Sequence, residues 1–121
     1  MHELALSEAI VDAVMARADT RPVTEARVRI GYLRQVVPDA LTFAWSMTTE
    51  GTALDGCELA VEHVPATVAC RACGAHSVLS VPVLLCGECG TTDVELVTGD
   101  EFLLVSIELA AVEPRPARRV P

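Results

Sequence analysis

The spacing of apolar residues changes repeatedly between helical and strand periods in the first half of the chain. Over 3–18 they recur at steps of three and four, which predicts an amphipathic helix with acidic residues in its first turn. Over 26–30 they alternate with arginines, which predicts a half-buried strand ending at Gly31. Residues 38–51 show a second helical stripe, from a first-turn proline to a glycine suited to the helix end. Alternation returns over 57–62, so the predicted order is helix, strand, helix, strand.

A different region begins at Pro65 in the second half of the chain. Residues 66–98 contain no aromatic residue, and a run at 78–85 has the composition of a strand. After a turn at 99–100, residues 103–109 have the clearest strand pattern of the chain. We expect this strand to return to the sheet of the first half. Its shared face is predicted to hold Leu103, Val105, Ile107 and Leu109.

These patterns predict an α+β fold, in which a small mixed sheet and two helices are interrupted by an inserted cysteine-bearing module. The predicted main domain combines residues 1–64 with 99–112, and the inserted module covers 65–98. A tail, 113–121, is rich in proline and arginine and lacks apolar periodicity, so we expect it to be disordered.

The composition of the chain excludes several classes of function. The chain has 121 residues, enough for one domain with a small appendage, and a formal net charge of -8. This acidity argues against nucleic acid and anionic membranes as partners. All basic residues are arginines, which excludes lysine Schiff-base chemistry and a phosphate-loop lysine. No membrane-spanning stretch or signal peptide is visible, so we expect a cytoplasmic protein without disulfides.

Five cysteines supply the strongest chemical signal. Cys70 and Cys73 form one Cys-x2-Cys pair, Cys86 and Cys89 form another, and a glycine follows each pair. Two such turns bring four thiolates around one ion, which predicts a closed, structural, zinc-ribbon-like site. Iron in a rubredoxin-like electron carrier and reduced cysteines without metal are the alternatives. The fifth, Cys57, is interpreted as a buried strand residue, with a redox or intersubunit role as the alternative.

The N-terminus offers a second metal-binding pattern. The α-amine of Met1, backbone nitrogens and the imidazole of His2 can form fused chelate rings in one plane, and Glu3 can add its amide. Square-planar nitrogen coordination suits Ni(II) or Cu(II). A histidine at position two is also consistent with a solvated terminus. His63 and His76 are interpreted as surface or hydrogen-bonded histidines rather than ligands.

Both patterns occur together in one known family. The opening Met1–Leu4, Ile30-Gly31, the segment Val37–Phe43, and the paired cysteines before Gly99-Asp100-Glu101-Phe102 follow one another in order. The chain thereby resembles the HypA/HybF family of hydrogenase nickel-incorporation proteins up to about Glu113. The resemblance implies a nickel metallochaperone, not an enzyme, with a nickel-binding α+β domain and a zinc module inserted before the last strand.

The resemblance also implies ligands and partners. Nickel would be held by His2 with backbone nitrogens of Met1 and Glu3, and zinc by the four paired cysteines. Expected partners are the nickel-handling GTPase HypB and the large subunit of [NiFe]-hydrogenase; homodimerisation and a role in urease maturation stay open. The alternative is a zinc-ribbon interaction or regulatory module with no nickel role.

Overall fold

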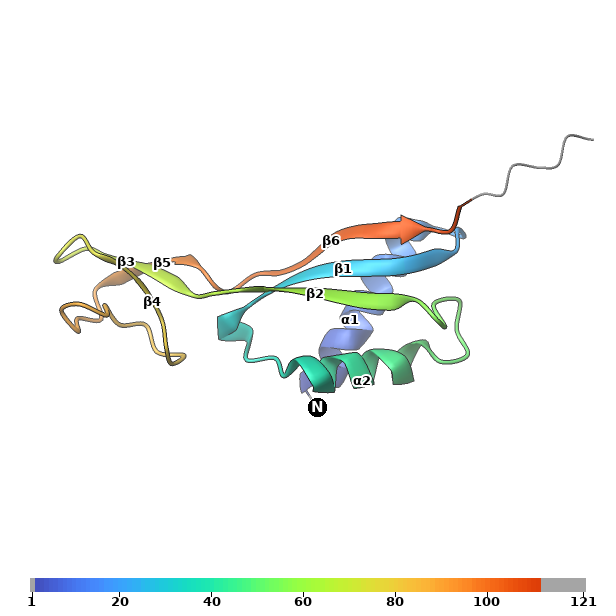
Figure 1. The fold of residues 1–121 in the computed structure, drawn as a ribbon, viewed down its shortest axis with the longest axis horizontal. Coiled ribbons are helices and arrows are strands. Elements are labelled where there is room, and N and C mark those ends of the chain that lie inside the picture. Colours follow the sequence, from blue (N-terminus) through green and yellow to red (C-terminus); the bar gives the residue numbers. More distant parts are fainter. Residues whose placement is uncertain (1, 112–121) are drawn as a thin grey trace, which may run out of the picture.

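The computed structural model describes residues 2–111 as an elongated molecule with a small sheet towards each end (Figure 1). Met1 and the tail predicted at 113–121 lie outside these residues. The helices are α1 (His2–Ala18), the short 3-10 helix η1 (Tyr32–Arg34) and α2 (Pro38–Thr49). The strands are β1 (Val23–Gly31), β2 (Glu58–Val64), β3 (Thr67–Cys70), β4 (His76–Val78), β5 (Val94–Thr98) and β6 (Phe102–Leu109).

The two α-helices form where the apolar stripes predict them. In α1 the buried side chains of Ile10, Val14 and Ala18 follow the helical period, so one face is directed at the core. Helix α2 has Pro38 in its first turn, and Gly51 follows its end with a φ of 74°, a value that glycine adopts without strain. Within the part of the chain that the structure describes, no helix combines the length and apolarity needed to cross a membrane.

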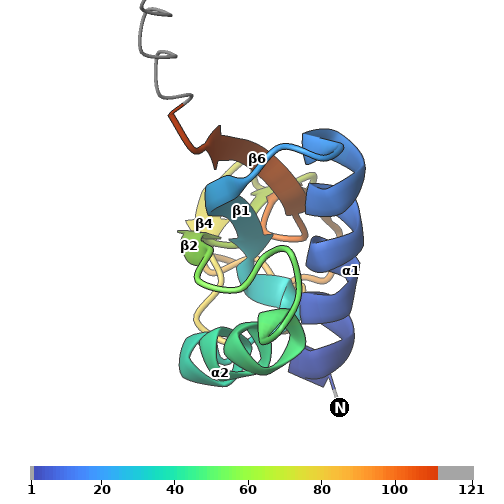
Figure 2. The same cartoon turned by 90° about the vertical axis from the view of Figure 1, so that its right-hand side faces the viewer.

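The first sheet has the order β2-β1-β6, with β2 parallel and β6 antiparallel to the central β1. The parallel pair requires a crossover, which η1 and α2 supply. Both helices lie on one side of this sheet, as the end-on view in Figure 2 shows. The main core lies between the two layers. It includes Ile10, Val14, Val28, Ile30, Leu41, Trp45, Leu54 and Cys57.

The second sheet has the order β4-β3-β5, with both pairs antiparallel. All three strands come from the chain between β2 and β6, so the region is an insertion into the first sheet, as predicted. Its own core is small. It consists of Val68, Cys70, Cys86 and Val94, with Ala75, Leu79 and Leu96 against them. The α+β class with a cysteine-bearing insertion is therefore confirmed.

The prediction of one strand-like run at 78–85 is wrong. Only Val78 belongs to a strand, and the backbone bends from Ser80 onward. Pro82 has no N–H to give to a neighbouring strand, and the N–H of Val83 donates to the carbonyl of Val81 across it at 2.7 Å. Strands β3 and β5 of this sheet are short and were not predicted.

The prediction for the face of β6 is correct in its second half and wrong in its first. Ile107 and Leu109 pack against the main core, but Leu103 is 52% exposed and Leu104 takes its place inside. The pairing with β1 skips Val105, because Arg27 pairs with Ser106 and Val28 with Leu104. An extra residue in one strand reverses the faces beyond it, and apolar alternation does not reveal such a bulge.

Close backbone packing joins the two sheets. A Cβ added to Gly31 would lie 2.1 Å from the carbonyl carbon of Gly99, and one added to Gly99 would lie 2.5 Å from Cα of Ala66. The N–H of Gly31 donates to the Glu101 carbonyl, and the N–H of Leu33 donates to the Gly99 carbonyl, both at 2.8 Å. Any larger residue at Gly31 or Gly99 would push the crossing chains apart, so this junction depends on two glycines.

Candidate metal sites

The four paired cysteines meet at the end of the second sheet. Their sulfur atoms all lie within 4.8 Å of one another. The distance is 3.7 Å from Cys70 Sγ to Cys89 Sγ, and 3.6 Å from Cys73 Sγ to Cys86 Sγ. A regular tetrahedron with Zn–S bonds of ~2.3 Å has sulfur–sulfur edges of about 3.8 Å. The cluster therefore has the size and donor set of a four-thiolate site for one ion.

Each pair is shaped by the same tight turn. The N–H groups two and three residues on point at the first sulfur, at 3.3 Å each for Cys70 and at 3.4 and 3.5 Å for Cys86. Gly74 and Gly90 close the two turns with φ values of 77° and 76°. Their N–H groups donate to the carbonyls of Cys70 and Cys86. The two turns thus place the sulfurs through the backbone, with glycine where the positive φ is required.

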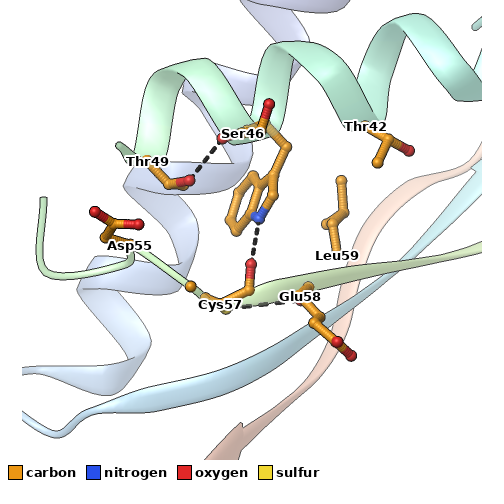
Figure 3. A pocket seen from close by; sticks show the side chains of 9 residues that line it. Thr42, Ser46, Thr49, Asp55, Cys57, Glu58 and Leu59 are labelled. Atoms are coloured by element: carbon orange, nitrogen blue, oxygen red, sulfur yellow. Dashed lines mark hydrogen bonds between the residues drawn. The ribbon is translucent and has the colours of Figure 1, made fainter. Parts of the chain in front are cut away.

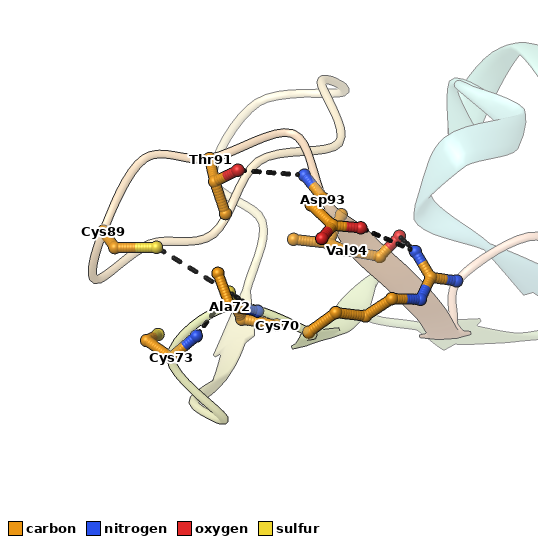
Figure 4. Close-up of polar contacts among 8 residues, drawn as sticks. Cys70, Ala72, Cys73, Cys89, Thr91, Asp93 and Val94 are labelled. Carbon is orange, nitrogen blue, oxygen red and sulfur yellow. Dashed lines mark hydrogen bonds and ion pairs between the residues drawn. The ribbon is translucent and has the colours of Figure 1, made fainter.

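Polar contacts fix the first turn to the strand β5. The Arg71 guanidinium donates to Asp93 Oδ1 at 3.3 Å and to the Val94 carbonyl at 3.0 Å, as Figure 4 shows. The hydroxyl of Thr91 accepts from the N–H of Asp93 at 3.2 Å. The ion pair is exposed and contributes little by itself. Its geometric effect is to hold one cysteine turn against the segment that carries the other.

The backbone N–H donors contribute to different pKa values for the four cysteine thiols. The N–H groups of Cys89 and Glu88 lower the pKa of Cys86 to about 6, and the N–H of Cys73 lowers the pKa of Cys70. For Cys73 the N–H of Ala75 acts to lower the pKa, but the sulfurs of Cys70 and Cys86 outweigh it and raise the pKa to about 12. Before metal binding, each pair therefore holds one sulfur with a lowered pKa, Cys70 or Cys86, and one with a raised pKa, Cys73 or Cys89.

These differences in thiol pKa predict how the affinity for a metal ion depends on pH. Cys73 and Cys89, whose pKa values are raised, must lose their protons when an ion binds, so affinity falls as pH falls. Displacement of at least these two protons lowers the apparent zinc affinity by at least about 100-fold for each unit by which the pH falls near neutrality. Competition with a chromophoric chelator at several pH values, corrected for the chelator's own protonation, measures the slope. A zinc affinity that does not change between pH 6 and 8 would contradict this assignment.

The other candidate site lies at the start of α1. The exposed His2 places its Nε2 2.8 Å from the carbonyl oxygen of Arg34, the last residue of η1. A carbonyl can only accept, so Nε2 is the donor of this bond, which does not involve Nδ1. Arg34 is held in turn, because its Nε donates to the Asp100 carbonyl at 2.8 Å. The predicted ligand Met1 lies outside the described residues.

Glu3 has a structural contact in addition to its predicted backbone role. Its Oε2 accepts from the N–H of Val37 at 3.3 Å, immediately before α2. A carboxylate at this position is stabilised by the positive end of the α2 dipole. The contact also connects the first turn of α1 to the start of α2. The backbone nitrogens of His2 and Glu3 lie in the first turn of α1, where N–H groups have no carbonyl of the same helix as partner.

The remaining candidates are Cys57, His63 and His76. Cys57 is buried where α2 faces the start of β2, beside a pocket of about 490 Å³ (Figure 3). Trp45 Nε1 donates to the Cys57 carbonyl at 2.8 Å, and burial raises the pKa of the Cys57 thiol. A protonated, buried thiol agrees with the packing interpretation. Within the described residues neither His63 nor His76 joins a cluster of potential ligands.

One contributor to the N-terminal site was not predicted, namely the main-chain carbonyl of Arg34. Any residue supplies a carbonyl, so no side-chain pattern in the sequence could reveal this contact. It arises because η1 turns the chain back towards the start of α1.

Comparison with known proteins decides the family. The family model described as hydrogenase/urease nickel incorporation, metallochaperone, hypA matches residues 1–109. The chain belongs to the HypA family. Hydrogenase maturation factors HypA from Nostoc sp. and Chloroflexus aggregans are 35% and 39% identical to it, over 93% and 89% of this chain and 98% of each relative. HypA from Streptomyces avermitilis is 38% identical over 88% of this chain and 86% of that protein.

A solved HypA structure has the same fold. The solution structure of the Ni metallochaperone HypA from Helicobacter pylori superposes with a TM-score of 0.63, covering 93% of this chain and all of that one. Sequence identity is only 18%, so the likeness concerns the fold alone. The resemblance noted from the sequence is thus confirmed, and the chain belongs to a family of nickel metallochaperones for hydrogenase maturation.

Proposed function

We propose that this HypA-family chain binds Ni(II) at its N-terminus and delivers it to [NiFe]-hydrogenase. The nickel ligands are Nδ1 of His2 and backbone nitrogens of Met1, His2 and Glu3. The observation that carries the proposal is the bond from His2 Nε2 to the Arg34 carbonyl. This bond leaves Nδ1 of His2 free. With the backbone amide nitrogen of His2, Nδ1 can close a six-membered chelate ring around the metal. Metal-binding histidines commonly donate their second ring N–H to a carbonyl in this way.

The start of α1 suits a carrier that must both bind and release its cargo. Square-planar nickel on backbone nitrogens requires amides that lose their protons. The first-turn amides of His2 and Glu3 have no helical acceptor, so their deprotonation breaks no hydrogen bond of the helix. The positive end of the helix dipole opposes a cation and so limits how tightly nickel is held. The first effect favours binding and the second favours release.

The four-cysteine cluster would hold zinc as a resident structural ion. Cys70, Cys73, Cys86 and Cys89 supply four sulfurs at tetrahedral separations and leave no coordination position for a substrate. The chain accordingly acts as a carrier and not as a catalyst. In this proposal residues 1–64 with 99–112 form the nickel-binding domain, and residues 65–98 form the zinc module.

The setting proposed for this carrier is the cytoplasm, where thiols stay reduced. Its proposed partners are the nickel-handling GTPase HypB and the large subunit of [NiFe]-hydrogenase, in keeping with its membership of a hydrogenase-maturation family. Both proteins handle or receive the metal that this chain would carry.

Metal analysis of untagged, full-length protein tests the proposal. We expect the purified protein to contain about one zinc per chain and to take up one Ni(II) in addition. The bound nickel should have the absorption spectrum of square-planar, diamagnetic Ni(II). Calorimetry gives the stoichiometry and absorption spectroscopy the geometry. Octahedral nickel would instead favour a zinc-ribbon module without a nickel role. The same conclusion would follow if the protein took up no more nickel than a control sample treated with a chelator. A red, iron-loaded protein would contradict the zinc assignment.

A further inference from the structure

The outer face of the first sheet is the face that carries no helix. Within residues 2–111 both α-helices pack against the opposite face (Figure 2). Ala26, Val28 and Ile30 of β1 are buried in the main core, so the residues that alternate with them point outward. The outer face presents four glutamates, two arginines and the 52% exposed Leu103. Its charged residues are Glu25, Arg27 and Arg29 of β1, Glu58 and Glu62 of β2, and Glu108 of β6.

Three of these glutamates form a row across the three strands. In the strand register Glu25 is opposite both Glu58 and Glu108. Like charges directly opposite on adjacent strands destabilise a sheet. Glu25 has a cation, because the Arg27 guanidinium donates to its Oε1 at 3.3 Å. Among the described residues no ion pair involves Glu58 or Glu108, and Figure 3 shows Glu58 pointing away from α2.

Both arginines of this face already have carboxylate partners. Arg27 pairs with Glu25, and Arg29 donates to Glu62 at 3.1 and 3.3 Å. The face therefore keeps a net charge of -2 and needs cations from another part of the chain or from another molecule.

The chain leaves the first sheet beside this row of glutamates. Ala110, two residues after Glu108, donates its N–H to the Pro22 carbonyl at 2.9 Å. Extended, the ten residues 112–121 can reach about 33 Å, whereas the row spans two strand spacings, about 10 Å. Every glutamate of the row is therefore within reach of this tail. The tail contains one acid, Glu113, and three cations, Arg115, Arg118 and Arg119.

We propose that residues 112–121 dock on the outer face of the first sheet, where the three tail arginines pair with the glutamate row. One exposed ion pair contributes little, but several charges in a network contribute more, and the tether makes the contact intramolecular. No helix or strand is predicted for the tail, and ionic contacts require neither. The docked tail would lie on the face opposite α1, which begins at His2, so the helix side of the domain would stay open to partners.

The sign of a stability change tests the proposal in the full-length, zinc-loaded protein. Glu58→Gln with Glu108→Gln removes two partners of the tail and should lower the melting temperature by about 2 °C. The tail variant combines Arg115→Gln, Arg118→Gln and Arg119→Gln. In the tail variant the same two glutamate substitutions only relieve repulsion, so they should raise the melting temperature by about 2 °C.

A matched control removes the same charge elsewhere. Glu8→Gln with Glu95→Gln changes two exposed carboxylates, on α1 and β5, and should give the same shift with either tail. Amide chemical shifts then locate the contact. Introducing the tail variant should move the signals of β2 and β6 around Glu58 and Glu108 and leave those of β3 and β4 in place. Raising NaCl to about 0.5 M should move the same signals in the wild type, because the contacts are ionic.

Three results would overturn the proposal. The first is an equal rise in melting temperature with either tail, or signals of β2 and β6 that do not move, because the tail would then lie elsewhere. The second is a contact that grows with protein concentration, which would assign the face to the tail of a second copy. The third uses an added oligo-arginine peptide, which should bind the face of the tail variant at least tenfold more tightly than that of the wild type. Equal binding to both would show that the face is free for an external basic partner.

Discussion

Replacing His2 with alanine should weaken nickel binding by more than about two orders of magnitude, since loss of a direct ligand exceeds the usual effect of losing an outer-shell contact. The substitution removes Nδ1 and with it the six-membered chelate ring. Zinc content should stay near one per chain, because the cysteine cluster lies in the other sheet. Calorimetry with Ni(II) measures the affinity, and elemental analysis measures zinc in the same samples.

Two further variants make the His2 result specific. Adding Gly-Ser before Met1 converts the α-amine into an amide, and we expect the same loss of nickel although every native side chain is kept. His76→Ala removes a histidine from β4 and should leave nickel affinity unchanged. Unchanged affinity in both His2→Ala and the extended chain would place nickel elsewhere. Loss only in His76→Ala would move the site to the second sheet.

Replacing Cys86 with serine should abolish zinc retention and unfold the second sheet while the first sheet stays folded. The second core is small, and two of its four buried residues, Cys70 and Cys86, are themselves cluster cysteines. Structural zinc in small modules supplies about 10–16 kcal/mol of apparent binding free energy, which so small a core cannot replace. Amide hydrogen exchange should show lost protection over 67–98 and retained protection in β1 and α2.

Cys57→Ala provides the matched control for the Cys86 experiment. It also removes one buried thiol, but from the main core, so zinc content and protection over 67–98 should not change. Its expected effect is a modest loss of global stability from the small cavity, about 1 kcal/mol. A Cys86→Ser protein that keeps normal protection over 67–98 without bound metal would show that the second sheet needs no ion.

Local patterns in the sequence were enough to predict the helices and the cysteine cluster. Each Cys-x2-Cys-Gly unit shapes its own turn through backbone contacts within four residues, so the spacing alone carries the geometry. Helix α2 was predicted because Pro38 and Gly51 mark its ends and the stripe between them faces one core.

Features that depend on distant parts of the chain were not predictable in the same way. The face of Leu103 is set by a bulge in the pairing of β6 with β1, whose residues lie more than 70 positions away in the sequence. The carbonyl of Arg34 meets His2 only because η1 returns towards α1. Strands β3 and β5 are short, and their pairing brings together residues separated by the whole cysteine loop.

The pairing around β1 has a consequence for how this architecture can vary. Gly31 pairs with Val64 of β2 and the adjacent Ile30 with Phe102 of β6, so the inserted region leaves and re-enters the first sheet at one end of β1. These two points are separated by two strand spacings, about 10 Å, a gap that roughly four to six residues of ordinary linker can cross. Topologically, the cysteine-bearing region occupies the position of a loop. It can therefore lengthen, shorten or be exchanged during evolution without rethreading the sheet and helices that carry the N-terminus.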